Sequence, residues 1–272
     1  MPELAEVETV RNVLKQKILN KKIKKVDILY EKMIENDIDE FKRILLNNSF
    51  KDILRYGKWL IFELESHYLL SHLRMEGKYF IKSSSEPIAK HEHVIISFND
   101  NSDLRYHDTR KFGRMKIIIK NELWNSKELK NQGLEPFNDK LDTKYLLTKF
   151  AHKKIPIKTA LLDQSIICGL GNIYADEVLF ASGINPNRSA DSIKEDECHK
   201  IIMNSKQILL KAIEEGGTTI KSYTSSLGVT GNYQNFLRVH KRLNMECYNC
   251  KTKIKRIKIG GRSTYYCENC QK

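Results

Sequence analysis

The chain opens with Met1-Pro2-Glu3-Leu4-Ala5-Glu6-Val7-Glu8, and apolar residues then continue at helical spacing at Val10, Leu14 and Ile18. Proline suits the first position of a helix, because the N–H that it lacks would have no partner there. The spacing therefore predicts a helix that starts at Pro2. Glu3 and Glu6, three residues apart, then share one face of its first turn.

This first turn carries groups suited to covalent chemistry. Pro2 is small, so we expect Met1 to be removed, which leaves Pro2 with a free secondary amine. The positive end of a helix favours the neutral amine, and only the neutral amine is a nucleophile. Such an amine beside a carboxyl group can form an imine with a sugar carbon. Acidic residues in a first turn are more often plain partners of the helix dipole, so this stretch alone leaves a structural role open.

The charge of the chain indicates a polyanionic partner. A chain of 272 residues can form two domains and an appendage, and this one carries a formal charge of +13 at pH 7. Residues 233–272 contain ten Lys or Arg against two Glu, so +8 of the +13 lies in the last forty residues. A solvated basic surface is the simple explanation of a charge run, but this concentration favours nucleic acid.

The cysteines near the C-terminus predict a metal site. Four of the six form two pairs with sixteen residues between them, Cys247-x2-Cys250 and Cys267-x2-Cys270. This spacing is typical of a tetrahedral four-cysteine zinc site with no position open for catalysis, so we expect one structural Zn2+. Residues 254–259 and 263–266 predict two strands around Gly260-Gly261, with Arg262 at the hairpin tip.

The cellular compartment supports this interpretation of the cysteines. The sequence shows no signal peptide and no apolar run long enough to span a membrane, so we expect a cytoplasmic protein. In that compartment paired cysteines are more often metal ligands than disulfides. The isolated Cys168 and Cys198 are expected to be ordinary packed thiols.

The first half of the chain is expected to be rich in β-strands. Short apolar runs are separated by polar or turn-forming segments, for example at 59–62, 68–70, 94–96 and 117–119. Repeated short strands without intervening helices predict an antiparallel β-sandwich. An amphipathic insert at 38–46 predicts a second helix.

Three places in this half could carry function. Gly57-Lys58 precedes a strand, where a lysine is usually solvated. Met75 lies at a strand end, where a methionine is usually core filling. In the stretch 107–113, Arg110 and Phe112 would share one side of an extended segment. An arginine beside an exposed aromatic residue suits a wedge that enters a base stack.

Two histidines, His91 and His93, lie two residues apart. On a strand they would share a face, which could indicate a metal pair. No third ligand is evident nearby in the sequence, so hydrogen-bonding or phosphate-contacting roles are favoured.

From Thr143 the apolar periodicity becomes helical. Helices are predicted near 143–151, near 158–164, up to about residue 181, and from about 193 to 215. Gly216-Gly217 ends the last helix, and the polar stretch 222–235 predicts a mobile loop.

A glycine turn precedes the third of these helices. Asn172 follows Gly169-Leu170-Gly171 and is placed as an N-cap, and glycines before a helix allow backbone N–H groups to approach an anion. Most such turns only connect elements. Together with Lys153, Lys154 and Lys158, this turn predicts a phosphate-binding site.

Seven motifs occur in order along the chain: PELAEVE (2–8), RYGKW (55–59), HLRMEGKY (72–79), TRKFG (109–113), LLDQSIICGLGNIYADEVLF (161–180), GGTTIKSY (216–223) and GGRSTYYC (260–267). With them the chain resembles the formamidopyrimidine-DNA glycosylases. Ala5 replaces the second proline of the family's opening, but the amine and both carboxylates remain. The resemblance implies an α+β multidomain protein. Its parts are an antiparallel β-sandwich with a leading helix (1–130), a helix–two-turn–helix domain with a lesion-recognition loop (131–235) and a four-cysteine zinc finger with a β-hairpin (236–272).

The resemblance also implies roles for individual residues. Pro2 matches the Schiff-base nucleophile and Glu3 the proton donor in base excision, with Glu6 as a further candidate in the catalytic group. Lys58 matches the donor for β-elimination and Arg262 the donor for δ-elimination. Residues that match DNA-contacting positions are His91, Arg110, Lys153, Lys158 and Asn172. Residues that match those filling the gap left by the extruded nucleotide are Met75, Arg110 and Phe112.

The implied activity is repair of damaged double-stranded DNA. Oxidised purines such as 8-oxoguanine and formamidopyrimidines would be excised, and the abasic strand then cleaved by β,δ-elimination, by a monomer that associates with the bacterial nucleoid. One alternative is an endonuclease VIII-like glycosylase for oxidised pyrimidines, although Leu4 and the three gap-filling residues resemble the purine-specific branch. Another is a non-enzymatic zinc-ribbon DNA-binding protein, which the matches at Pro2, Glu3, Lys58 and Arg262 disfavour.

Overall fold

The computed structural model describes residues 1–218 and 231–272. They form two compact units, here called the sandwich unit (Met1–Lys130 and Gly216–Asn232) and the helical unit (Asn131–Glu215 and Tyr233–Lys272). Most of the loop predicted at 222–235 lies outside the described residues, and its described end contains a 3-10 helix, Tyr233–Phe236. Within the described ranges, no helix combines the length and apolar character that a membrane crossing needs.

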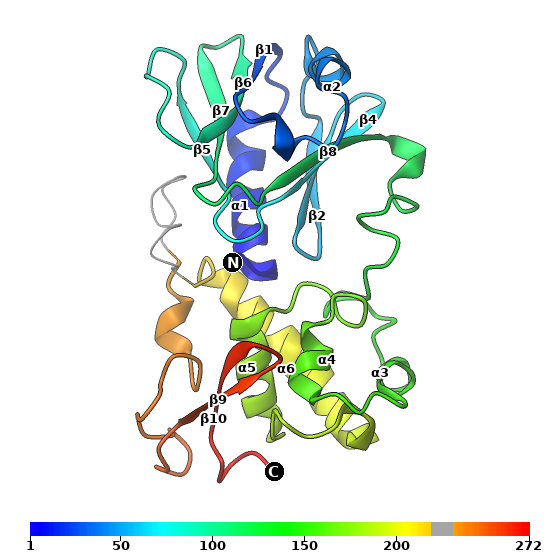
Figure 1. Ribbon diagram of the computed structural model, residues 1–272, viewed down its shortest axis with the longest axis vertical. Coiled ribbons are helices and arrows are strands. Elements are labelled where there is room, and N and C mark those ends of the chain that lie inside the picture. Colours follow the sequence, from blue (N-terminus) through cyan, green and yellow to red (C-terminus); the bar gives the residue numbers. More distant parts are fainter. Residues whose placement is uncertain (219–230) are drawn as a thin grey trace. The chain divides into compact units, whose positions relative to one another are not determined.

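The sandwich unit contains two four-stranded antiparallel sheets (Figure 1). One has the strand order β1 (Ile23–Ile28), β6 (Glu92–Phe98), β7 (Ser102–His107) and β5 (Lys78–Ser83). The other has the order β2 (Asp52–Tyr56), β3 (Trp59–Glu63), β4 (His67–His72) and β8 (Arg114–Ile119). The predicted β-sandwich is confirmed, and each of the four apolar runs lies in one of its strands.

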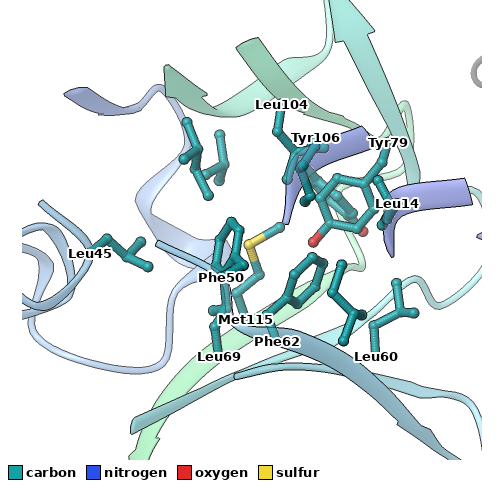
Figure 2. Packing of buried hydrophobic residues seen from close by; sticks show 14 of the residues in the cluster. Leu14, Leu45, Phe50, Leu60, Phe62, Leu69, Tyr79, Leu104, Tyr106 and Met115 are labelled. Atoms are coloured by element: carbon teal, nitrogen blue, oxygen red, sulfur yellow. The ribbon is translucent and has the colours of Figure 1, made fainter. Parts of the chain in front are cut away.

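The core of this unit lies between the sheets, because strands of both sheets turn alternate apolar side chains inward. Figure 2 shows part of it, with Phe62 of β3, Tyr79 of β5, Tyr106 of β7 and Met115 of β8 in one cluster. The rings of Tyr79 and Tyr106 meet edge to face, with centroids 5.1 Å apart. Two helices complete the same core, α1 (Leu4–Ile18) and the predicted α2 (Ile38–Leu45).

The N-terminal helix begins later than predicted. α1 starts at Leu4, and Glu3 is its N-cap residue with extended backbone (φ −103°, ψ −174°). The Glu3 N–H donates to Glu6 Oε2 at 2.9 Å. This contact satisfies a backbone donor at the helix start and holds Glu3 extended, so Pro2 lies before the first turn instead of within it.

The helical unit contains all four helices expected from the periodicity: α3 (Thr143–Phe150), α4 (Ile157–Leu162), α5 (Asn172–Ser182) and α6 (Glu195–Glu214). The N-cap prediction for Asn172 is wrong, because Gly171 occupies the cap and Asn172 is the first helical residue. Short 3-10 helices occur at Glu31–Met33 and Lys120–Glu122 in the sandwich unit and at Ala190–Ser192 in the helical unit.

The predicted hairpin is present as β9 (Lys255–Ile259) and β10 (Arg262–Tyr266). Ile259 pairs with Arg262, so Gly260-Gly261 is the two-residue turn and Arg262 directly follows it. Both glycines have positive φ (54° and 77°), as this tight type of turn requires. Arg262 is therefore at the start of β10 and exposed, one position past the predicted tip.

Candidate functional site

The start of the chain, just before α1, is buried. Pro2, Glu3 and Glu6 are all buried, the two carboxylates being only 2% and 3% exposed. Met1 is present in the structure, so the terminal amine there belongs to Met1. Burial lowers the pKa of this amine, Glu3 and Glu6 oppose the effect, and Lys58 adds to it. A lowered pKa raises the fraction of neutral amine, which is the form a nucleophile needs.

Lys58 lies in the two-residue turn between β2 and β3, beside Gly57 with φ +56°. A lysine in such a turn is normally solvated, but Lys58 is only 5% exposed. Its charge acts on the terminal amine and on His72. The structure thus brings Lys58 to the same enclosed region as Pro2 and Glu3, an arrangement that the local sequence pattern did not indicate.

Glu6 is engaged in structural hydrogen bonds. Its Oε2 accepts from the Glu3 N–H, and its Oε1 accepts from the Thr218 N–H at 2.8 Å and from Thr218 Oγ1 at 3.0 Å. The preceding Gly217 has φ +78°, and a Cβ there would lie 2.9 Å from Glu6 Oε1. Glu6 therefore holds the backbone at 217–218 against the first turn of α1, and its catalytic role stays a prediction.

Arg110 and Phe112 lie together at the surface, as the wedge interpretation needs. The guanidinium carbon of Arg110 is 4.8 Å from the centroid of the Phe112 ring, and Phe112 is 48% exposed. The segment is not extended, because Lys111 has φ +59°. Asp108, fully buried, accepts from the Arg110 N–H at 3.0 Å and from the Gly113 N–H at 2.8 Å. This carboxylate shapes the loop, and the prediction from sequence missed it.

The loop that carries Met75 and the loop that carries Arg110 and Phe112 both pack against Tyr106. A Cβ on Gly77 would lie 2.0 Å from Tyr106 Oη, and a Cβ on Gly113 would lie 1.9 Å from the same atom. The Thr109 hydroxyl donates to the Glu76 carboxylate. Two glycines thus allow both loops to pack directly against one buried tyrosine. Met75 itself is half-buried.

The histidines do not form a metal site with any third ligand that the structure describes. His91 has φ +73° and precedes β6, and its ring lies 6.1 Å from that of His93 and 5.8 Å from that of His107. A ring nitrogen of His93 lies 2.9 Å from the carbonyl oxygen of Asp108. His93 therefore has a hydrogen-bonding role, as expected, and His91 is half-buried just before the start of β6.

The phosphate-binding site predicted in the helical unit is only partly supported. Lys153 is half-buried, Lys154 is exposed, and Asn172 Nδ2 donates to the Ser263 carbonyl at 3.0 Å. Lys158 is completely buried, with Nζ 2.6 Å from Asp176 Oδ1. A phosphate at the surface cannot reach this ammonium, so a DNA contact by Lys158 does not fit the structure. The local sequence could not reveal its acidic partner on α5.

The four C-terminal cysteines converge as predicted. The Sγ atoms lie within 4.8 Å of one another, with Cys247 to Cys270 at 3.8 Å and Cys250 to Cys267 at 3.4 Å. These distances exceed a disulfide bond of about 2.05 Å. A tetrahedral zinc with Zn–S bonds of about 2.3 Å would separate its sulfurs by about 3.8 Å, so the cluster fits one structural Zn2+. The other two cysteines, Cys168 and Cys198, are buried free thiols as expected.

Comparison with known proteins covers the whole chain. Residues 1–115 match the formamidopyrimidine-DNA glycosylase N-terminal domain, residues 132–224 match the H2TH domain of the same enzymes, and residues 246–272 match a zinc finger found in FPG and IleRS. The formamidopyrimidine-DNA glycosylase of Shouchella clausii is 44% identical over 273 residues, covering 100% of this chain and 99% of the relative. The enzyme of Streptococcus pneumoniae strain R6 is 42% identical over 272 residues, with the same coverage.

Solved structures agree with these sequence relatives. A Lactococcus lactis FPG variant bound to Fapy-dG-containing DNA superimposes with a TM-score of 0.95, 38% identity and full coverage of both chains. The complex of Lactococcus lactis Fpg with abasic-site DNA gives a TM-score of 0.94 and 38% identity over 99% of each chain. The buried N-terminus, the Arg110–Phe112 pair and the four-cysteine cluster therefore occur in a chain that belongs to the formamidopyrimidine-DNA glycosylase family.

Proposed function

We propose that this protein removes oxidised purines from damaged double-stranded DNA and then cleaves the abasic strand. The activity follows from family membership, and DNA complexes are among the related structures. The three proposed parts are a catalytic domain (1–130), a DNA-binding domain (131–235) and a zinc finger (236–272). The enzyme would act as a monomer on the chromosome in the bacterial cytoplasm.

The observation that carries the catalytic assignment is the burial of Pro2 and Glu3 at the start of the chain, with Lys58 buried as well. Once Met1 is removed, the secondary amine of Pro2 would occupy this region next to Glu3. The amine attacks the anomeric carbon of the flipped nucleotide as the purine leaves, and Glu3 supplies a proton for base excision. The amine then loses its proton and the bond from the anomeric carbon to the ring oxygen breaks, which opens the sugar ring and gives an iminium that joins the sugar to Pro2.

The same intermediate explains strand cleavage. The positive iminium acidifies the neighbouring sugar carbon, so elimination can release the phosphate on one side of the sugar and then the phosphate on the other. Lys58 is the proposed donor for the first elimination, which its burial near the terminus supports. Arg262, exposed at the start of β10, is the proposed donor for the second.

DNA binding divides into a wedge and phosphate contacts. Met75, Arg110 and Phe112 would fill the gap left when the damaged nucleotide is extruded, a step that costs a few kcal/mol. The stacked Arg110–Phe112 pair supports this role. His91, Lys153 and Asn172 remain proposed backbone contacts. Zinc, held by the four cysteines, would only stabilise the hairpin that carries Arg262.

Borohydride trapping on an 8-oxoguanine duplex tests the covalent step. Reduction followed by proteolysis and mass spectrometry should place the sugar adduct on the peptide that begins at Pro2. An exposed lysine titrates about two to three pH units above an α-amine, so the terminus has the larger neutral fraction near pH 7. An adduct on Lys58 would overturn the assignment.

Two controls sharpen this experiment. A leucine inserted between Met1 and Pro2 should block Met1 removal, leave the proline nitrogen as an amide and abolish trapping. A thymine glycol duplex should be cleaved more slowly than the 8-oxoguanine duplex. Faster cleavage of thymine glycol would point to the pyrimidine-specific branch instead.

A further inference from the structure

One buried carboxylate on α5 joins three segments of the helical unit. Asp176 is 1% exposed, and its Oδ1 lies 2.6 Å from Nζ of Lys158 on α4. Its Oδ2 lies 2.7 Å from Nδ1 of His240 and accepts from the Tyr265 N–H of β10 at 3.3 Å. Asp176 thus connects a helix, the zinc hairpin and the segment that leads into it.

Lys158 reaches the hairpin as well. Its ammonium donates to the Ser263 carbonyl at 3.1 Å and to Thr264 Oγ1 at 2.9 Å. The Asp176 carboxylate adds an ion pair to these two hydrogen bonds. Ser263 and Thr264 directly follow Arg262 in β10. The buried ammonium of Lys158 therefore contacts the strand right beside the exposed arginine.

Glu177, the next residue of α5, supports the same arrangement. Its buried carboxylate accepts from three consecutive backbone N–H groups, at 2.8 Å from Arg238, 3.0 Å from Val239 and 2.8 Å from His240. The chain is therefore fixed to α5 just before the first zinc-ligand pair. Asp176 and Glu177 together hold residues 238–240, which lead to the hairpin, and Tyr265 of β10.

We propose that Lys158 and Asp176 are a positioning pair that fixes the zinc hairpin on α4 and α5, and through it Arg262. Lys158 is then no phosphate contact. The proposal rests on the proposed function only for the role of Arg262, because the attachment of the hairpin is independent of catalysis. Removing one member of a buried ion pair leaves an uncompensated charge, whereas replacing both with apolar residues of similar size is often tolerated.

A double-substitution experiment on the full, zinc-loaded chain tests this pair. The variants are Lys158→Met, Asp176→Leu and the two combined, and the first measurement is hydrogen exchange of the amides in 255–266. Each single variant should accelerate this exchange by about tenfold or more. The combined variant should be closer to the parent than Asp176→Leu, because both lose the acceptor of His240 Nδ1 and the Tyr265 N–H but only Asp176→Leu also keeps the charge of Lys158 without its carboxylate. If a single variant does not fold, Lys158→Arg and Asp176→Asn give the milder perturbation.

The second measurement separates positioning from phosphate contact. The affinity for a duplex with an abasic-site analogue is measured against salt concentration, with Lys153→Met as the matched control. Loss of one phosphate contact lowers the slope of log affinity against log salt by about 1, which we expect for Lys153→Met. The combined variant should keep the parental slope. A slope lowered by about 1 in the combined variant, with parental exchange of the hairpin, would show that Lys158 contacts phosphate and overturn the proposal.

Failure of this proposal is distinguishable from failure of the proposed function. Hydrogen exchange of the hairpin needs neither lesion nor chemistry. If the exchange pattern holds but borohydride traps no adduct on the parent protein, the positioning pair stands and the catalytic assignment falls. If the parent protein is trapped at Pro2 but hairpin exchange is unchanged in every variant, the catalytic assignment stands and the positioning pair falls.

Discussion

Replacing Gly113 with alanine tests whether Tyr106 supports the loop that carries Arg110 and Phe112. The added Cβ would lie 1.9 Å from Tyr106 Oη and 2.7 Å from its Cζ, well inside van der Waals contact. Tyr106 is 1% exposed and belongs to the core between the two sheets, so its ring cannot move into solvent. Gly113 does not have a positive φ, so this contact is the source of the strain.

The structure gives the size of the effect. Overpacking of a well-packed core costs about 1–3 kcal/mol. In a protein of this size such a loss lowers the melting temperature by about 2–10 °C. Because the clash is next to Phe112, relief by movement of the loop would also displace the wedge and slow excision from duplex DNA.

Calorimetry of four proteins measures this contact: the parent, Gly113→Ala, Tyr106→Phe and the double variant. Removing Oη leaves the ring carbon at 2.7 Å as the nearest atom, so alanine at 113 should cost less in the Phe background, with a coupling of about 0.5 kcal/mol or more. Single-turnover excision is measured on the same proteins. An unchanged melting temperature for Gly113→Ala, or an equal cost in both backgrounds, would refute the role of Tyr106.

Three further predictions concern the zinc cluster, the wedge and acid stability. Cys267→Ser should release zinc and weaken binding to damaged duplex while the sandwich unit stays folded. If this variant binds damaged duplex as tightly as the parent, the hairpin does not contribute to DNA binding. Phe112→Ala should slow excision from duplex more than it weakens nonspecific binding, which phosphate contacts dominate, and equal losses would count against a wedge. Burial, aided by Arg74 and Lys58, lowers the pKa of His72 from 6.5 to about 3, so the folded state stays neutral where the unfolded chain is protonated. The free energy of unfolding should therefore fall as pH drops from 6.5 toward 3, by up to about 1.4 kcal/mol per pH unit from this group. Urea titrations at several pH values should show a weaker pH dependence for His72→Gln than for the parent. An equal pH dependence in both proteins would show that His72 does not take up a proton on unfolding.

Features that depend on nearby residues were predictable from the sequence alone. The zinc ligands lie in two short pairs, and the four helices of the helical unit follow from apolar periodicity within each segment. The sandwich strands followed from short apolar runs. The candidate nucleophile and its acidic neighbours are also adjacent in the chain. The spacing predicts a start at Pro2, but α1 starts at Leu4, because the Glu6 carboxylate caps the helix at Glu3.

The solvation of charged side chains was decided only by the tertiary structure. Lys58 and Lys158 both look like surface lysines in their local sequence, yet both are buried. Lys158 is attached to residues more than one hundred positions away, Ser263 and Thr264. A lysine in water and a lysine in a buried ion pair have the same local sequence pattern, because the partner that compensates the loss of hydration comes from another segment. The sequence therefore indicated the candidate residues, and packing between distant segments decided which of them are exposed and which are buried.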